Sequence, residues 1–407
     1  MNTMFKNSGI LLSTLILAAC GSDDHHSDDH DEHAHSLMIS QQSTTTLSFL
    51  EEGSAESLAQ AAADTGAQLL LSSTGEQAAI ITSGQVQFVS AHHEEDSTEE
   101  ESTEEAHSDE DHELPELSDT VVTATNPVVI NTNGHFSVLA DGHTQFVPFE
   151  TLGAPEILNL GTETYPGLLL EETATELVVL TFNGSNMTAT EIGETNTSLN
   201  SENCAVVNSV AQSADFAVVS CDDANFIVSL DESGEDHVVN IDPLMDESLS
   251  QAVQWKTAAG VFVGLGADNK YYVLEKDELY ALALIDSAGF AAPAGLCSDA
   301  WALDSLAADI LALTATHVNV LDHEGGSDSI QLDQSPNSTT CEDLHMATAS
   351  QAVFVLDNNG AVAYEIDKED GSTEYHIHGR ETLSVNDVAS VVSFHEAGEE
   401  GHDHSHE

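Results

Sequence analysis

Apolar residues recur along most of the chain in short runs that turn residues interrupt. Residues 78–89 and 134–147, for example, each read as a strand, a tight turn and a second strand, with Gly, Ser or Asp at the break. Five more units of this kind follow at intervals of 40 to 48 residues, and only the first interval, which holds an acidic insertion, is longer. The seven units begin at Ala78, Gly134, Glu176, Phe216, Val261, Asp309 and Gln351.

A repeat of this length, with four short strands in each unit, predicts an all-β fold of the β-propeller type. Seven blades fit the spacing best, with six and eight as alternatives. We expect the propeller to span residues 46–398, with the apolar run of residues 388–394 pairing with residues 46–50 to close the ring. A two-domain β-sandwich protein is the other architecture that the strand pattern allows.

The N-terminus carries an apolar run from Gly9 to Ala19 that is too short for a transmembrane helix and is typical of a signal peptide. It ends in Leu-Ala-Ala-Cys at residues 17–20, which resembles the lipobox of bacterial lipoproteins. That resemblance implies that residues 1–19 are a signal peptide and that Cys20 is lipidated. Because Gly21 rather than Asp follows the cysteine, it also implies an outer-membrane anchor in the cell envelope, with the lipid as the only membrane contact. An ordinary secretory signal is the alternative.

The charge of the chain is strongly one-sided, with 72 Asp and Glu against 6 Lys and Arg and a formal net charge of −66. Such a surface repels phosphate backbones, so we expect no nucleic-acid partner and instead expect cations or basic partners. Hydrophobic residues still make up 41% of the chain, enough for a packed core. Adaptation to a salty exterior is a competing explanation for the acidity.

Four further cysteines, Cys204, Cys221, Cys297 and Cys341, follow the lipobox. An even number in an oxidising compartment predicts two disulfides. Of the three pairings we favour Cys204–Cys221 and Cys297–Cys341, because the first pair flanks two apolar runs that could be adjacent strands. A zinc–cysteine site is disfavoured because the chain has no Cys-x-x-Cys spacing.

Histidines gather in or near three acidic segments: a tether over residues 20–45, an insertion over residues 92–117 and a tail over residues 399–407. Neutral imidazole beside carboxylate is the ligand set that zinc prefers, so these segments predict Zn²⁺ binding. A solvated low-complexity tail with no metal is the alternative. The candidate ligands in the tether and the tail are His25, His26, His30, His33, His35, His402, His404 and His406.

A more ordered metal site requires histidines on strands. If the stretch is extended, His376 and His378 lie on one face, roughly 6.5–7 Å apart, with Tyr375 and Ile377 on the other. Other candidate ligands are Asp343 and His345, just before a strand, and His135, beside a hairpin.

The order of these features is similar to that of the AztD-type periplasmic zinc metallochaperones, over most of residues 75–395. The features shared are the acidic His-bearing insertion, the hairpin of residues 134–142, the Cys204–Cys221 segment and the stretch Asp-Leu-His-Met-Ala-Thr-Ala-Ser at residues 343–350. The resemblance implies a β-propeller that binds zinc and passes it to the solute-binding protein of a zinc ABC transporter. One feature departs from the family, because Ala-Val-Val-Asn follows Cys204 where a His-containing stretch is expected.

Patterns of catalytic residues are absent: the chain has no Gly-x-Ser-x-Gly, no P-loop and no His-Glu-x-x-His. We therefore expect a binding protein rather than an enzyme such as a lyase or quinoprotein. The favoured function is a lipid-anchored protein that captures Zn²⁺ in the cell envelope and hands it over or stores it. The alternative is a β-propeller that acts as an interaction scaffold of the outer membrane, with an acidic, salt-adapted surface.

Overall fold

The structure is a computed structural model in which the described residues form β-strands and one short 3-10 helix. No helix among these residues is long and apolar enough to cross a membrane. The described residues are 35–51, 54–61, 65–91, 115–158, 160–172, 177–192, 196–213, 216–222, 224–229, 238–240, 253–276, 282–284, 289–304, 308–322, 327–332, 340–348, 352–358, 362–368, 375–382, 385 and 387–395.

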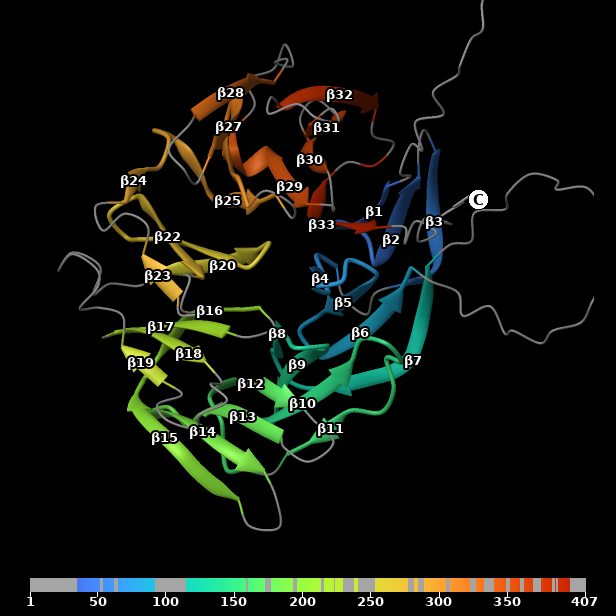
Figure 1. Cartoon of the computed structure of the whole chain (residues 1–407). Helices are drawn as coiled ribbons and strands as arrows, with labels where there is room; N and C mark the ends of the chain where they lie inside the picture. The colour runs from blue at the N-terminus through green and yellow to red at the C-terminus, as the bar shows by residue number, and fades with distance from the viewer. Residues whose placement is uncertain are drawn as a thin grey trace, which may run out of the picture. The chain divides into compact units, whose positions relative to one another are not determined.

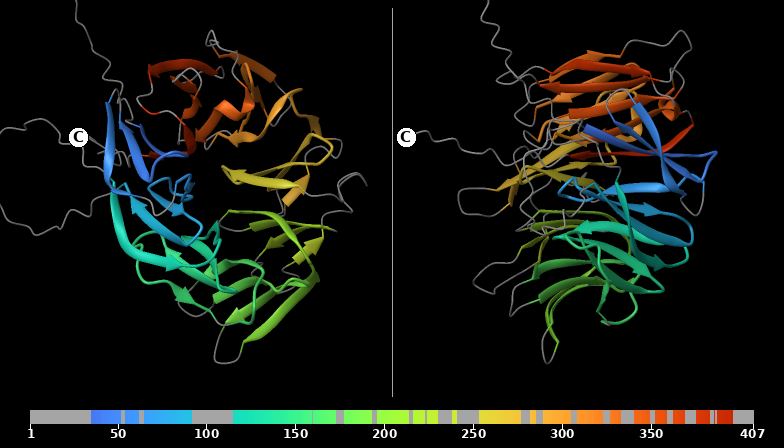
Figure 2. Two further views of the ribbon diagram at one scale, coloured as in Figure 1. Left: turned by 180° about the vertical axis from the view of Figure 1, so that it is seen from behind. Right: turned by 90° about the vertical axis from the view of Figure 1, so that its right-hand side faces the viewer.

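The strands form eight antiparallel sheets that follow one another around a centre, as in a β-propeller (Figure 1; Figure 2 shows them from behind and from the side). Seven sheets are each built from one stretch of chain, and their strands pair in chain order.

The first of these sheets contains β4 (Gln68–Leu71), β5 (Gln77–Ile81), β6 (Gln85–Ser90) and β7 (Glu116–Thr123), and the second contains β8 (Val128–Thr132), β9 (His135–Ala140), β10 (His143–Pro148) and β11 (Glu156–Ile157). The third contains β12 (Tyr165–Glu172), β13 (Leu177–Phe182), β14 (Asn186–Ile192) and β15 (Thr197–Asn203). The fourth contains β16 (Val207–Gln212), β17 (Phe216–Cys221), β18 (Asn225–Ser229) and β19 (Val238–Asn240).

The fifth sheet contains β20 (Gln254–Ala258), β21 (Val261–Leu265), β22 (Lys270–Lys276) and β23 (Leu282–Leu284), and β24 (Phe290–Ala291) also pairs with β22. The sixth contains β25 (Leu296–Leu303), β26 (Ile310–Thr314), β27 (His317–Leu321) and β28 (Ser327–Gln331). The seventh contains β29 (Leu344–Thr348), β30 (Ala352–Asp357), β31 (Val362–Lys368) and β32 (Tyr375–Thr382).

The eighth sheet, here called the closing sheet, joins the two ends of the described chain. Its order is β3 (Ser54–Ala61), β2 (Thr46–Glu51), β1 (His35–Gln41) and β33 (Val388–His395). The strand β33 is innermost and contacts the first strands of both neighbouring sheets, β29 and β4. Pairing the last strand with the first leaves no open edge between the beginning and the end of the ring.

The prediction of an all-β propeller agrees with this architecture, but the prediction of seven blades is wrong, because there are eight. The seven strand–turn–strand units identified in the sequence are the second and third strands of the seven local sheets. The repeat pattern did not reveal the eighth sheet, because its strands come from both ends of the chain and no single segment contains a complete repeat unit.

Two predicted boundaries and one predicted strand pairing also change. Residues 35–41, assigned to the tether of residues 20–45, form β1. Residues 388–394 therefore pair with β1, and β1 in turn pairs with residues 46–50 of β2. The last two residues of the insertion assigned to residues 92–117 begin strand β7, while residues 92–114 lie outside the described part of the chain.

Hairpin turns form where the sequence placed Gly beside Asp or Asn. Asp141 and Gly142 both have positive φ, 53° and 80°, which is the geometry of a tight turn between β9 and β10. In the β13–β14 hairpin the Asn183 Oδ1 atom accepts the N–H groups of Ser185 and Asn186 at 3.0 and 2.8 Å, and Gly184 has a φ of 79°.

The core is divided among the junctions between sheets. Each of eight hydrophobic clusters takes its side chains from two neighbouring sheets, so every sheet packs on both faces. Strands buried on both faces read as continuous apolar runs, as Ala-Val-Phe-Val-Leu does in β30. The closing sheet follows the same rule, with Met38 and Phe49 packed towards β4–β7 and Ile39 and Leu50 packed towards β29–β32.

Substitution of Phe394 tests whether the closing sheet packs as described. Its side chain is 1% exposed, and its ring centroid lies 6.4 Å from that of Phe49. We expect Phe394→Ala to lower the free energy of unfolding by about 3–5 kcal/mol. Ile157→Ala removes a side chain that is 56% exposed and should change it by less than about 0.5 kcal/mol. Urea unfolding of the two variants beside the wild type measures both, and equal effects would contradict the described packing.

Candidate functional site

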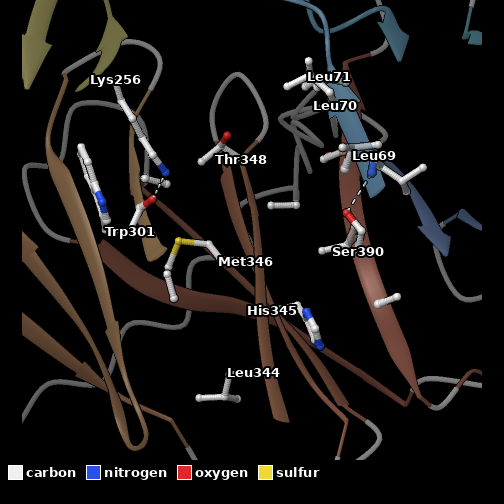
Figure 3. A pocket seen from close by; sticks show the side chains of 17 residues that line it. Leu69, Leu70, Leu71, Lys256, Trp301, Leu344, His345, Met346, Thr348 and Ser390 are labelled. Carbon is white, nitrogen blue, oxygen red and sulfur yellow. Dashed lines mark hydrogen bonds between the residues drawn. The ribbon is translucent and has the colours of Figure 1, made fainter. Parts of the chain in front are cut away.

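A cavity of about 560 Å³ opens between the innermost strands of five sheets (Figure 3). Its walls come from β4, β20, β25, β29 and β33, which are far apart in the sequence. Most of the lining residues are apolar, including Leu69 to Leu71, Trp301 and Met346. Among the polar groups, His345 is the side chain with the chemistry of a metal ligand. The centre of the propeller therefore offers a place for a small ligand.

His345 lies on β29, directly after the 3-10 helix of Cys341–Asp343. Two features hold this helix in place. The Asp343 carboxylate accepts hydrogen bonds from the Thr340 N–H at 2.9 Å and from the Thr340 hydroxyl at 2.7 Å. Cys341 is bonded to Cys297 on β25 of the neighbouring sheet. The start of β29, which carries His345, is thus held both by hydrogen bonds within its own segment and by a disulfide to the neighbouring sheet.

Asn358 sets the hydrogen-bonding state of His345. Its Oδ1 atom accepts the Val388 N–H at 3.0 Å, and its Nδ2 atom donates to the Val388 carbonyl at 3.3 Å, so the amide can face only one way. The same Nδ2 atom lies 3.1 Å from His345 Nε2. Because Nδ2 can only donate, Nε2 must accept, and the imidazole is neutral with its proton on Nδ1.

The electrostatics agree with a neutral imidazole. Burial lowers the pKa of His345, and the nearby Asp343 carboxylate offsets part of this by raising it. Neutral imidazole is the form that binds metal ions. A metal at Nδ1 would displace the Nδ1 proton, whereas one at Nε2 would displace Asn358.

Lys256 supplies the positive charge in the cavity wall, and Trp301 holds it. The ammonium donates to the Trp301 carbonyl and lies 4.6 Å from the centre of the Trp301 ring (Figure 3). The Met346 thioether lies between this pair and His345 in the same view. The cavity therefore has one cationic corner at Trp301 and one neutral imidazole corner near Ser390.

The predicted pairing of His376 with His378 stays a prediction, because the side chain of His378 lies outside the described part of the structure. The imidazole of His376 lies 3.5 Å from an Asp367 carboxylate oxygen on β31, and Tyr375 and Ile377 pack on the opposite side, as expected. At His378, however, the register shifts between Glu365 and Ile366, so the strand no longer alternates simply between its two faces.

The remaining predicted ligands of the propeller are spread over the fold. His135 lies on β9, where its Nδ1 atom donates to the Asn133 carbonyl at 2.7 Å and its ring stands edge-on to Phe146. Asp343 and His345 interact electrostatically, but the Asp343 carboxylate is already held by Thr340. In the part of the chain that the structure describes, no three His, Cys, Asp or Glu side chains come together as a metal site.

Several predicted positions lie outside the described residues, and they stay predictions. His35 is the exception among the histidines of the tether, because it is the first residue of β1. The positions outside are the signal peptide of residues 1–19, Cys20, His25, His26, His30, His33, His402, His404 and His406.

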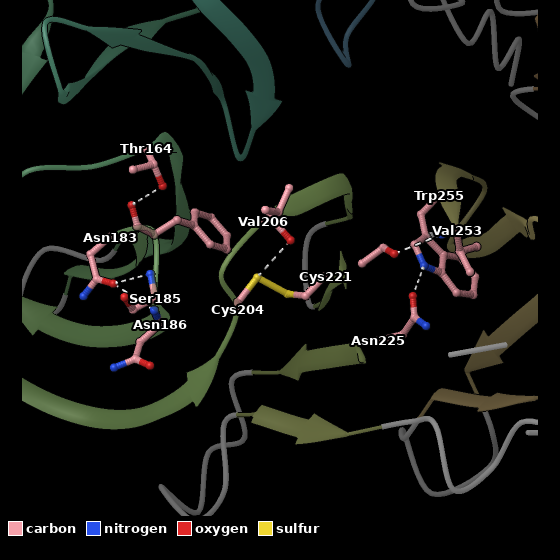
Figure 4. The surroundings of a disulfide bond; sticks show 12 residues. Thr164, Asn183, Ser185, Asn186, Cys204, Val206, Cys221, Asn225, Val253 and Trp255 are labelled. Atoms are coloured by element: carbon pink, nitrogen blue, oxygen red, sulfur yellow. Dashed lines mark hydrogen bonds between the residues drawn. A yellow bond between two sulfur atoms is a disulfide. The ribbon is translucent and has the colours of Figure 1, made fainter. Parts of the chain in front are cut away.

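Both favoured disulfides are present. Cys204, in the connection after β15, is bonded to Cys221 at the end of β17 and so ties two neighbouring sheets together (Figure 4). A loop of this size contributes about 3 kcal/mol to stability. Beside it, Trp255 Nε1 donates to Asn225 Oδ1 at 3.3 Å and links the next pair of sheets.

Asn358 and Lys256 were missed by sequence reasoning. Asn358 lies in the Asp-Asn-Asn-Gly stretch of residues 357–360, which reads as an ordinary hairpin turn. Its partner Val388 is 30 residues away, so no local pattern marks it. The signal that could have drawn attention to Lys256 is the scarcity of basic residues, since only 6 occur in the chain.

Comparison with solved structures identifies proteins of the same architecture. Two structures of AztD from Citrobacter koseri, one of them the apo form, match with TM-scores of 0.65 and 0.64 and 15% sequence identity. Each match covers 90% of this chain and 99% of the other. No protein-family model and no curated protein matches the chain. At this identity, the likeness shows that this chain shares the AztD fold.

The electrostatics of His345 can be measured directly. In an NMR titration of the imidazole, assigned by comparison with His345→Gln, we expect a pKa below the ordinary value of 6.5. Asp343→Asn should lower it further, because the neutral amide no longer favours the imidazolium but still accepts hydrogen bonds from Thr340. A midpoint at or above 6.5 in the wild type would show that burial is not the dominant effect.

The same lowered pKa makes stability depend on pH. As the pH falls below about 6.5, the unfolded chain binds a proton at this histidine before the folded protein does, so the free energy of unfolding decreases. The decrease from this group ends at the lower, folded-state pKa. We expect His345→Gln to flatten the dependence in this window, as measured by urea unfolding between pH 7.5 and 5. An unchanged profile would argue against a buried, neutral His345.

Proposed function

We propose that this protein binds Zn²⁺ in the cell envelope and hands it over or stores it, in a metallochaperone-like role. It acts as a binding protein rather than an enzyme and is anchored through a lipid on Cys20. Zinc is its cargo. Its partner, if the resemblance to AztD-type proteins holds, is the solute-binding protein of a zinc ABC transporter.

The observation that carries this proposal is the state of His345. The imidazole is half-buried, neutral and held at the wall of the central cavity, and the Asp343 carboxylate lies close enough to influence its pKa. Imidazole and carboxylate are the donors that zinc takes in proteins. Two protein donors leave coordination positions open to water or to a receiving protein, as reversible binding of a cargo ion requires.

The shared fold adds support. The stretch of residues 343–350 is one of the features that carry the sequence resemblance to AztD-type proteins. It includes His345, which lines the cavity, and Asp343, two residues before it. The comparison with Citrobacter koseri AztD covers 90% of this chain, so the likeness extends over most of it.

The charge favours a cationic cargo. With 72 Asp and Glu against 6 Lys and Arg, the surface raises the local concentration of divalent cations and disfavours anionic ligands. Protonation of imidazole opposes zinc binding. Because burial lowers the pKa of His345, this site should retain zinc to a lower pH than an ordinary solvated imidazole does.

Zinc binding is tested by equilibrium dialysis of protein purified without a His tag, followed by metal analysis. We expect micromolar or tighter binding at neutral pH. Binding should weaken below about pH 6 at solvated histidines, whose unperturbed pKa is about 6.5, and at a lower pH at His345, whose pKa burial lowers. His345→Ala should weaken the tightest class of sites by at least about tenfold. His317→Ala is the matched control, since His317 lies on β27 of another sheet, with Nδ1 2.7 Å from the Thr316 hydroxyl.

Deleting residues 22–34 and 399–407 separates the propeller from the His-rich ends. Zinc binding that survives the deletion and is lost in His345→Ala places the cargo in the central cavity. Binding that disappears with the deletion assigns the cargo to the ends of the chain instead. If the full-length protein binds no zinc above background at neutral pH, the proposed function is wrong.

A further inference from the structure

The wall of the central cavity reverses the charge of the rest of the chain. About one residue in six of the whole sequence is Asp or Glu, since there are 72 among 407. The 17 described residues that line the cavity include no Asp and no Glu. They do include Lys256, one of only 6 basic residues in the chain. The charge that a ligand meets in this wall is therefore positive, in a molecule with a net charge of −66.

The ammonium of Lys256 is held in a fixed position. Lys256 lies on β20, and its ammonium donates to the carbonyl of Trp301 on β25 of the next sheet. It also lies 4.6 Å from the centre of the Trp301 ring. That ring is 1% exposed and stands edge-on to Tyr271, with 5.4 Å between the ring centroids. Because its support is packed in the core, the ammonium is oriented before any ligand arrives.

Two other polar groups of the wall have protons to donate. The Nε2 atom of His345 accepts from Asn358, so the ring carries its proton on Nδ1. The Ser390 hydroxyl accepts the N–H of Leu69 at 3.1 Å, which leaves the hydroxyl proton for a second hydrogen bond. With the ammonium, the wall thus offers three kinds of donor, and such a set matches a ligand that carries acceptor oxygens.

The size and the apolar part of the wall define the rest of the ligand. Figure 3 shows Lys256 on one side of the cavity and Leu69, Leu70 and Leu71 on the other. A small inorganic anion at Lys256 would leave these leucines in contact with water, whereas an apolar body would cover them. The volume of about 560 Å³ lies within the range of small-molecule sites.

We propose that the central cavity binds a small organic monocarboxylate, with its carboxylate at Lys256 and its apolar body against the leucines of β4. A single ammonium matches a single negative charge, whereas phosphate groups are usually held by several cationic or N–H donors. An amine would place a second positive charge beside the first. This inference goes beyond the proposed zinc function and does not depend on it, because an ammonium repels Zn²⁺ and the two ligands use different corners of the cavity.

The acidic exterior does not prevent such binding. At physiological ionic strength the Debye length is about 8 Å, so most of the surface carboxylates are screened from a ligand at the centre of the ring. An ammonium in contact with the carboxylate is screened much less, because few ions and little water separate the two charges. The charge of the wall, rather than the net charge of the chain, therefore determines which ligand the cavity takes.

The test is isothermal titration calorimetry of the full-length protein with hexanoate, in the presence of a chelator so that no metal mediates binding. We expect hexanoate to bind at least about tenfold more tightly than hexan-1-ol, and hexylamine to bind less tightly than either. From acetate to hexanoate the affinity should increase by a factor of about three to four for each methylene that becomes buried.

Substitutions of two lysines separate the proposed contact from a general effect of charge. Lys256→Met removes the ammonium but keeps an unbranched apolar side chain, so it should weaken hexanoate binding at least about tenfold and leave hexan-1-ol unchanged. Lys270→Met is the matched control. Lys270 lies on β22, outside the cavity wall, with its side chain 40% exposed and its ammonium 3.8 Å from Asp268. This variant should bind hexanoate as the wild type does.

Equal affinities of the wild type for hexanoate and hexan-1-ol would overturn the proposal, as would unchanged hexanoate binding in Lys256→Met. If Lys256→Met does not fold, the wild-type series of carboxylate, alcohol and amine decides the question alone. Failure of this site is distinguishable from failure of the zinc proposal. Lys256→Met should still bind zinc in dialysis, and His345→Ala should still prefer hexanoate to hexan-1-ol.

Discussion

The pairing of β1 with β33 is the interaction on which the rest of the structure depends. The other seven sheets are local, because each forms from one stretch of chain. Without this pairing β33 would have no hydrogen-bonding partner among the described strands, and the apolar faces of β4–β7 and β29–β32 that it covers would meet water. Closure converts a row of sheets into a ring in which every sheet is packed on both faces.

The geometry of the central cavity depends on this closure. One wall is β33 itself. The Ser390 hydroxyl on that strand accepts the N–H of Leu69 on β4, at 3.1 Å, between the closing sheet and the β4–β7 sheet. The orientation of Asn358, which determines the protonation of His345, depends on both backbone groups of Val388 at the start of β33. The strand that joins the chain ends thus also sets the chemistry of the candidate ligand.

Two of the few basic residues, Lys256 and Lys368, are partly buried and make contacts within the fold. Lys256 is held by Trp301 at the cavity wall, and Lys368 pairs with the carboxylate of Asp309. The Tyr375 hydroxyl lies 2.8 Å from Asp304 and 2.9 Å from Asp309, and burial together with these carboxylates raises the pKa of Tyr375. Asp304 and Asp309 are buried, and a buried carboxylate without a partner would lower the stability of the fold. These contacts therefore matter in a chain with a net charge of −66.

The sequence by itself determined the features that depend on neighbours along the chain. The strand–turn–strand units, the Asp141–Gly142 turn and the favoured disulfides follow from local periodicity, from backbone preference and from the number and spacing of cysteines. Only the tertiary structure decided the number of sheets, the contact of Asn358 with His345 and the register of β1 and β33, in which His35 pairs with His395. Each of these depends on segments that approach one another only after the ring has closed, and pairing between residues 360 positions apart leaves no periodic signal in either segment.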